Sequence, residues 1–431
     1  SERNCIISME TAQALVSDEY RLETTRRIEQ IRRQFPILNR IVNDKSLVYL
    51  DNGASTQMPQ SVIQTVSDYH TYHHSNVHRG VHTLSQEATQ LFEDSREKVR
   101  AFINAPSDRE VIFTSGTTDS MNLVYQCWGR TFMKEGDTIL VSNMEHHANI
   151  VPWYMLAQEK GVTLKVIPIT EEGTLDIDVF KNLLTPDVKA VAVNHVSNAL
   201  GTINPIKWIC DVCREKGIVT IIDGAQAVGH FPVDVQALGC DFYAFSSHKL
   251  HGPTGIGVLY GREELLSKMP PYRGGGDMIL SVSFDKVTYN DLPHKFEAGT
   301  PAISQVIGLG AAIDYINGLD RAFLEEYEHQ LLQYATMKLS QVPGLRIIGT
   351  ASEKVSLVSF VIKGVHPHDI GSILDEDGVA VRTGHHCAQP VMERYNVPAT
   401  TRASMAFYNT FDEIDALYDA LLKVTTLFDV N

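Results

Sequence analysis

Short runs of β-branched and aromatic residues alternate with amphipathic segments from Ser46 onward. Most of the runs are continuously apolar, which is typical of parallel strands buried on both faces. Between two of them, residues 84–103 place Ala88, Phe92 and Val99 on one helical face. The predicted strands are residues 47–50, 111–114, 138–141, 163–167, 190–194, 219–222, 242–245 and 256–259. This alternation predicts an α/β fold with a doubly wound, mostly parallel sheet.

The pattern changes after residue 317, where a long charged helix is predicted. It spans residues 320–341 and precedes two strands (345–348 and 356–362) and two helices (369–376 and 412–427). We therefore expect a large domain at 43–317 and a smaller α+β domain at 318–431. Residues 1–42 form an N-terminal extension with a helix that we expect to pack on the small domain. Its arginines alternate with acidic residues, which favours a surface helix over a transit peptide.

The charge, the length of the apolar stretches and the cysteine content exclude several classes of function. The 431 residues carry 37 Lys and Arg against 52 Asp and Glu, a net charge of −15, which argues against nucleic acid or an anionic membrane as the main partner. No apolar stretch approaches the length of a membrane helix. Six scattered cysteines, Cys5 among them, favour reduced thiols and a cytoplasmic location. The chain begins at Ser1, and Met9 is a candidate native start.

Three predicted strands end in polar residues at the edge where α/β sheets bind ligands. The strand 111–114 leads into Ser115-Gly116-Thr117-Thr118 at a helix start, which suits a phosphate; a simple Ser/Thr helix cap is the alternative. The strand 219–222 delivers Asp223, which suits a ribose, a metal or a protonated ring nitrogen, unless it merely belongs to a turn.

The third strand, 242–245, ends in Ser246-Ser247-His248-Lys249. A buried lysine has a lowered pKa and serves as an amine nucleophile, whereas most lysines lie at the surface. A phosphate cradle, an acid and a lysine together match the needs of pyridoxal 5'-phosphate (PLP). Neither a complete GxGxxG fingerprint nor a Walker loop is present to indicate another cofactor.

A fourth site lies in the small domain, in residues 382–390 around Cys387. This cysteine follows a predicted strand at 379–382 and stands near a helix start beside His385 and His386, which favours an exposed thiolate. A buried apolar cysteine is the alternative, and a metal site is disfavoured because adjacent residues rarely give tetrahedral geometry. The CxxC pair, Cys210 and Cys213, falls inside a predicted helix and is interpreted as packing.

These motifs, in this order, resemble the class V, fold-type-I PLP enzymes over nearly the whole chain. More narrowly they resemble the SUF-type (group II) cysteine desulfurases and the selenocysteine lyases. The matching stretches are YLDNGA (49–54), NVHRG (76–80), SGTT (115–118), EHHAN (145–149), DGAQ (223–226), SSHK (246–249), FEAGTP (296–301) and RTGHHC (382–387).

The resemblance implies specific roles for the cofactor-binding residues. Lys249 would bond to the cofactor aldehyde, Asp223 would hold the pyridine nitrogen, and His146 would stack on the ring and assist proton transfer. Gln226 would contact the ring hydroxyl. The phosphate would be bound by hydroxyls and an imidazole, namely Thr117, Thr118, Ser246, His248 and, from the other subunit of a homodimer, Thr300.

The resemblance also implies a substrate and a reaction. The carboxylate of L-cysteine would be bound by Arg402 and Asn198, with Arg382, His78 and Arg79 also in the substrate site; for Arg402, a surface charge is the alternative. Cys387 would attack the substrate sulfur and carry it as a persulfide, and no metal is expected.

A SUF-system acceptor protein would receive the sulfur for iron–sulfur cluster assembly, with contacts at the Cys387 loop and His368. Residues 367–369 also read as an ordinary helix start. The alternatives are a selenocysteine lyase, a transaminase and a catalytically silent scaffold.

Overall fold

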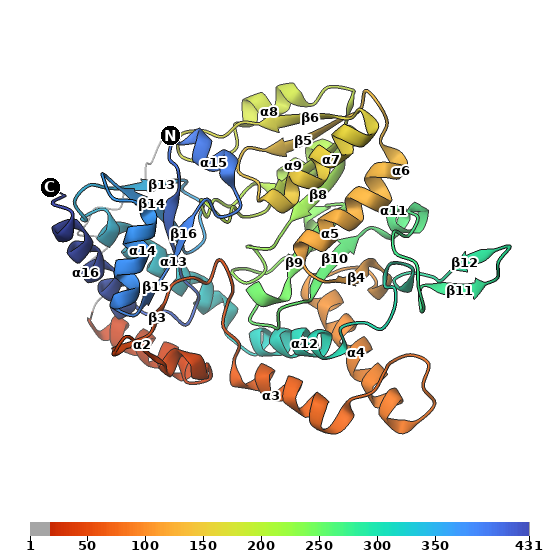
Figure 1. Cartoon of the computed structure of the whole chain (residues 1–431), viewed down its shortest axis with the longest axis horizontal. Coiled ribbons are helices and arrows are strands. Elements are labelled where there is room, and N and C mark those ends of the chain that lie inside the picture. The colour runs from red at the N-terminus through yellow and green to blue at the C-terminus, as the bar shows by residue number, and fades with distance from the viewer. Residues whose placement is uncertain (1–17, 431) are drawn as a thin grey trace.

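A seven-stranded sheet forms the centre of the computed structural model, which describes residues 18–430 (Figure 1). Its strand order is β4-β10-β9-β8-β7-β5-β6, and only β10 is antiparallel to its neighbours. The strands are β4 (Val111–Thr114), β5 (Thr138–Ser142), β6 (Thr163–Ile167), β7 (Val188–Asn194), β8 (Val219–Asp223), β9 (Phe242–Ser246) and β10 (Gly257–Gly261). The predicted fold class is confirmed.

Helices cover both faces of this sheet, because successive side chains of each strand point to opposite sides. On β8, Ile222 joins the core on one face and Ile221 the core on the other. The helices of this region are α3 (Gln60–Asp68), α4 (Thr83–Phe102), α5 (Thr117–Leu123), α6 (Arg130–Phe132), α7 (Val151–Lys160), α8 (Ile177–Leu183), α9 (Ile206–Glu215), α10 (Val235–Leu238), α11 (Glu263–Lys268) and α12 (Ile303–Asn317). Two further hairpins are β1 (Ile41–Val42) with β2 (Lys45–Ser46), and β11 (Ile279–Val282) with β12 (Val287–Tyr289).

The smaller region contains an antiparallel sheet with helices α13 (Arg321–Leu339), α14 (Pro367–Glu376), α15 (Gln389–Arg394) and α16 (Phe411–Leu427). Its strand order is β13 (Leu345–Ile348), β14 (Leu357–Ile362), β17 (Thr400–Ser404) and β16 (Arg382–Gly384). Helix α2 (Asp18–Arg32) lies against it, with Ile28 in its core and Arg32 paired to Glu413 at 2.9 Å. Cys5 and Met9 lie outside the described residues.

Two predicted strands pair differently from expectation. Residues 47–50 were expected in the central sheet, but β3 (Val48–Tyr49) pairs in parallel with β15 (Val379–Ala380) of the smaller region. The prediction is wrong because a short apolar run does not specify which sheet it joins. The strand expected at 379–382 is split, since Arg382 belongs to β16. The division at 42 and 317 stays a prediction.

No helix within residues 18–430 combines the length and the hydropathy needed to span a bilayer.

Candidate active site

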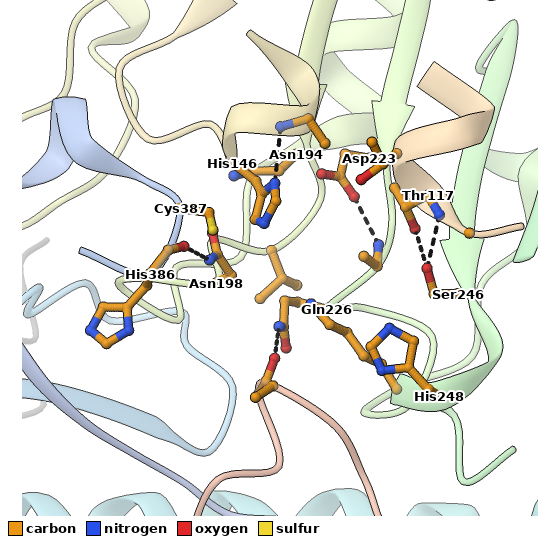
Figure 2. Close-up of a pocket in the computed structure, with 18 of the residues that line it drawn as sticks. Thr117, His146, Asn194, Asn198, Asp223, Gln226, Ser246, His248, His386 and Cys387 are labelled. Atoms are coloured by element: carbon orange, nitrogen blue, oxygen red, sulfur yellow. Dashed lines mark hydrogen bonds between the residues drawn. The ribbon is translucent and has the colours of Figure 1, made fainter. Parts of the chain in front are cut away.

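A cavity of about 540 Å³ opens at the carboxyl ends of the parallel strands and is closed on one side by the smaller region. It is lined by residues from the loops after β4, β5, β7, β8 and β9, and by the segment around Cys387 (Figure 2). The predicted site residues that line it are Thr117, Thr118, His146, Asn198, Asp223, Gln226, Ser246, His248, Lys249, Arg382, Cys387 and Arg402. The loops after the parallel strands and the smaller region together bring side by side residues that are up to 285 positions apart, from Thr117 to Arg402.

Hydroxyl groups and a backbone N–H converge at one end of the cavity. The backbone N–H of Thr117 donates to Ser246 Oγ at 2.9 Å, and the two hydroxyl oxygens lie 2.8 Å apart (Figure 2). Gly116 has φ of +150°, and a Cβ at Gly257 would lie 2.5 Å from Gly116 Cα. These glycines allow β10 to approach the turn, which leaves room for a small anion held by N–H and O–H donors.

Asp223, the last residue of β8, and Gln226, three residues further on, both line the cavity. Asp223 is 5% exposed, and its Oδ1 accepts the backbone N–H of Ala225 at 3.0 Å. Burial raises the pKa of Asp223, because the charged carboxylate is poorly solvated in the cavity. A cationic partner would therefore stabilise the charged form. Gln226 donates from Nε2 to Gly53 O at 2.6 Å, which fixes the side-chain amide against the cavity wall.

Lys249 follows β9 and lines the same cavity. Burial lowers the pKa of Lys249 to about 8, and the nearby Arg402 guanidinium acts in the same direction. Asp223 opposes the shift. An amine with this pKa has a far larger uncharged fraction near neutral pH than an ordinary lysine, and the uncharged form is the nucleophile.

His146 follows β5 and faces the cavity, and its Nδ1 accepts the backbone N–H of Ala148 at 3.0 Å. Burial lowers the pKa of His146 to about 4, and Lys249 adds to the effect. The ring is therefore neutral at physiological pH, with its proton on Nε2.

Two arginines share one carboxylate at the opposite end. Arg382 Nη2 lies 2.6 Å from Asp51 Oδ2, and the buried Arg402 lies 3.6 Å from Asp51 Oδ1. Sequence reasoning assigned no role to Asp51, although two arginines in one site require a counter-ion. Arg402 also donates from Nη1 to Asn198 O at 2.9 Å.

The buried polar atoms at this end that lack a hydrogen-bond partner among residues 18–430 include Arg402 Nε and Asn198 Oδ1. Buried polar groups are normally paired. A free guanidinium N–H beside a buried amide suits a ligand that carries both a carboxylate and an amine, as an amino acid does.

Cys387 is exposed and lies two residues before helix α15, close to the predicted helix start. Both His386 and Cys387 have positive φ, of 54° and 51°. Asn198 Nδ2 donates to His386 O at 2.7 Å (Figure 2). The backbone N–H of His147 donates to Cys387 O at 2.6 Å. The large region therefore holds the backbone of the cysteine loop.

The remaining predicted residues lie outside the cavity of this chain. His78 contacts Glu93 at 2.8 Å, Arg79 contacts Asp277 at 3.1 Å, and the exposed Thr300 accepts from Asn76. His368 is exposed in the first turn of α14. All four stay predictions.

The CxxC pair is buried inside α9, as the sequence indicated. Burial raises the pKa of Cys210 and of Cys213 to about 12, which leaves both as inert thiols. No group of three or more His, Cys, Asp or Glu side chains in the described part of the chain is arranged to hold a metal ion.

The chemistry of the cavity fits PLP. Donors for a phosphate, a buried carboxylate for the pyridine nitrogen and a buried amine for the aldehyde line one cavity. These groups are the Thr117–Ser246 pair, Asp223 and Lys249, respectively.

Comparison with known proteins gives a consistent result. The chain is 51% identical over 401 residues to a cysteine desulfurase of Serratia proteamaculans, covering 93% of this chain and 98% of the relative. It superposes on the crystal structure of the cysteine desulfurase CsdA, in an S-sulfonic acid form, from Escherichia coli. That match has a TM-score of 0.86 and 40% identity over 93% of this chain and 99% of the other.

A third match is the apo cysteine desulfurase of Thermococcus onnurineus, with a TM-score of 0.88 and 38% identity over 92% of this chain and 98% of the other. The aminotransferase class-V family profile matches residues 48–417. The cofactor of such an enzyme is PLP. By its sequence, its fold and the chemistry of its cavity, this chain belongs to the aminotransferase class-V family.

Proposed function

We propose that this protein is a PLP-dependent cysteine desulfurase that converts L-cysteine to L-alanine and keeps the sulfur as a persulfide on Cys387. The observation that carries the proposal is that a buried amine, Lys249, and an exposed thiol, Cys387, line one cavity. Relatives at about 50% identity, named cysteine desulfurases, support it.

Seven residues would hold the cofactor in place. Lys249 Nζ would bond to the aldehyde, Asp223 would pair with the ring nitrogen, and Thr117 and Ser246 would donate to the phosphate. Gln226 would contact the ring hydroxyl, and Thr118 and His248 would complete the phosphate site. Bound PLP supplies an electron-withdrawing ring that makes the substrate Cα proton acidic.

Arg402 and Asn198 would orient the substrate. The guanidinium would bind the substrate carboxylate through Nε and Nη2, and Asp51 would keep Arg402 and Arg382 paired before the substrate arrives. When the substrate carboxylate binds, it would replace Asp51 as the partner of Arg402. Because Asp51 lies 3.6 Å from Arg402 but 2.6 Å from Arg382, separating Asp51 from Arg402 would cost less electrostatic energy than separating it from Arg382.

Lys249 Nζ, freed when the substrate amine takes its place on the aldehyde, would take the proton from the substrate Cα, and its lowered pKa favours the uncharged form that can accept it. Neutral His146 would exchange a proton with the substrate through Nε2. Cys387 Sγ, as thiolate, would attack the substrate sulfur.

This sulfur transfer balances without an external oxidant. A new S–S bond forms on Cys387 as the substrate Cβ–S bond breaks, and the bonding electron pair stays with the carbon fragment. Protonation of that fragment yields alanine. The enzyme gains one sulfur atom, and the products together contain the same atoms as L-cysteine and the free thiol.

The finer assignments belong to the same proposal. The protein would work as a homodimer of the SUF type, in which Thr300, His78 and Arg79 reach the cavity of the other subunit. Their position outside the cavity of their own chain supports this arrangement. A SUF-system acceptor protein would dock at Cys387 and His368 in the cytoplasm and supply iron–sulfur cluster assembly.

The test is to incubate the holoenzyme with L-cysteine and a reductant, and to measure alanine and released sulfide. Equal amounts of both products are expected, with L-selenocysteine run in parallel to compare the two turnover rates. Consumption of L-cysteine without alanine would contradict the proposal.

A further inference from the structure

His147 holds the loop around Cys387 through two hydrogen bonds. Its backbone N–H donates to Cys387 O at 2.6 Å, and its imidazole Nε2 accepts the backbone N–H of Gln389 at 3.1 Å. One bond is made to Cys387 itself and the other to the first residue of α15. A single residue of the large region therefore joins the cysteine to the start of the helix that follows it.

The loop depends on such contacts because its own backbone is strained. His386 and Cys387 both adopt left-handed φ values, which non-glycine residues keep only where their surroundings impose them. Helix α15 has six residues, and Ala388 at its N-cap provides no side-chain acceptor. The imidazole of His147 accepts the N–H that a Ser or Asp cap would normally accept.

The same bond defines the protonation state of His147. Nε2 accepts an N–H only if the ring is neutral and its proton lies on Nδ1. Burial lowers the pKa of His147, and His385, whose ring centre lies 5.6 Å away, acts in the same direction. The neighbouring His146 lines the cofactor cavity, so one short turn contacts both the cavity and the cysteine loop.

We propose that His147 is a positioning residue that keeps the Cys387 thiol at the rim of the cavity during sulfur transfer. This inference rests on the proposed function and deepens it. His147 lies outside the lining of the cavity, so its loss slows the attack by Cys387 but leaves cofactor capture by Lys249 unchanged.

Two variants of the holoenzyme separate the hydrogen bond from packing. His147→Phe keeps a ring but has no acceptor, whereas His147→Gln places an amide oxygen near the position of Nε2. Backbone hydrogen exchange of the peptide that contains residues 385–389 is measured, together with alanine release in the first turnover. His147→Phe exchanges faster and releases alanine about tenfold more slowly, since one hydrogen bond is lost. In His147→Gln, the exchange rate of this peptide and the rate of alanine release both stay close to the wild-type values.

The cofactor absorption band serves as the control and stays unchanged in both variants. The proposal would be overturned if His147→Phe showed the same backbone exchange and the same first-turnover rate as the wild type. Equal impairment of the Gln and Phe variants would also overturn it, because the acceptor would then be irrelevant. If His147→Phe does not fold, His147→Asn, whose amide ends short of Gln389, replaces it. A wild-type protein that released no alanine would refute the proposed function, whereas the exchange measurement tests His147 independently of activity.

Discussion

The two reactive ends of the cavity differ in almost every physical property. Lys249 follows a central strand and is desolvated enough that its pKa falls to about 8. Cys387 is exposed, has a left-handed backbone and precedes a six-residue helix. Removing a Cα proton favours a dry, rigid site, whereas passing sulfur to another protein requires an accessible one. Under the proposed function, the interior of the cavity would carry out the proton transfer and the rim would deliver the sulfur.

Removing the buried amine has the largest expected effect. Lys249→Ala loses the visible absorption band of the bound cofactor and at least about 10⁴-fold in turnover, because one group is both the attachment point and the base. The absorption spectrum and the rate of alanine release measure this. Lys354→Ala is the matched control: burial lowers the pKa of Lys354 to about 8 as well, but this lysine lies outside the cavity. Equal effects of the two substitutions would contradict the assignment.

Removing the exposed thiol distinguishes sulfur transfer by Cys387 from cofactor binding by Lys249. Cys387→Ser keeps the absorption band but loses at least about 10³-fold in sulfur release, since a hydroxyl is a poor nucleophile toward sulfur. Spectra and sulfide assays check both parts. Cys213→Ala, a change at a buried thiol, retains sulfur release. Full activity of Cys387→Ser would remove Cys387 from the reaction.

Neutralising the buried acid gives an intermediate effect. Asp223→Asn has the same shape but no charge for the ring nitrogen, and about 10- to 100-fold lower turnover is expected from the loss of one charge-assisted hydrogen bond. Steady-state kinetics measure it, and cofactor content measured in parallel shows that binding persists. An unchanged kcat would show that Asp223 does not pair with the cofactor.

The smallest effect is a pH dependence. Because the pKa of Lys249 is lowered, its uncharged fraction rises with pH through about 8 and then levels off. The rate at which the apoprotein captures PLP should rise about fivefold from pH 7 to 8 and less than twofold from pH 8 to 9. Stopped-flow absorbance measures this rate. A tenfold rise per unit that continues above pH 9 would indicate an ordinary lysine.

The residues at the interior of the cavity, Asp223 and Lys249, could be predicted from the sequence more completely than the contacts around Cys387 at its rim. Strand β4 matches its predicted range, and β8 and β9 differ from theirs by one residue, because continuous apolar runs have few alternatives. Asp223 directly follows one of these predicted runs, and Lys249 lies four residues after another. Parallel strands place these residues at one edge by topology alone.

The rim depends on long-range contacts that local patterns do not encode. The link from His147 to Gln389 spans 242 positions, and the link from Asp51 to Arg382 spans 331. The pairing of β3 with β15 was missed for the same reason. The roles proposed for Thr300, His78 and Arg79 depend on contacts with a second subunit, which local patterns do not encode either.

Peptide mass spectrometry after a brief exposure of the holoenzyme to L-cysteine tests the central claim most directly. The account predicts one added sulfur atom on the peptide that contains Cys387, in amounts equal to the alanine formed, and none on peptides that contain the buried Cys127, Cys210, Cys213 or Cys240. Alanine formed without sulfur on Cys387, or sulfur found on a buried cysteine instead, would contradict it.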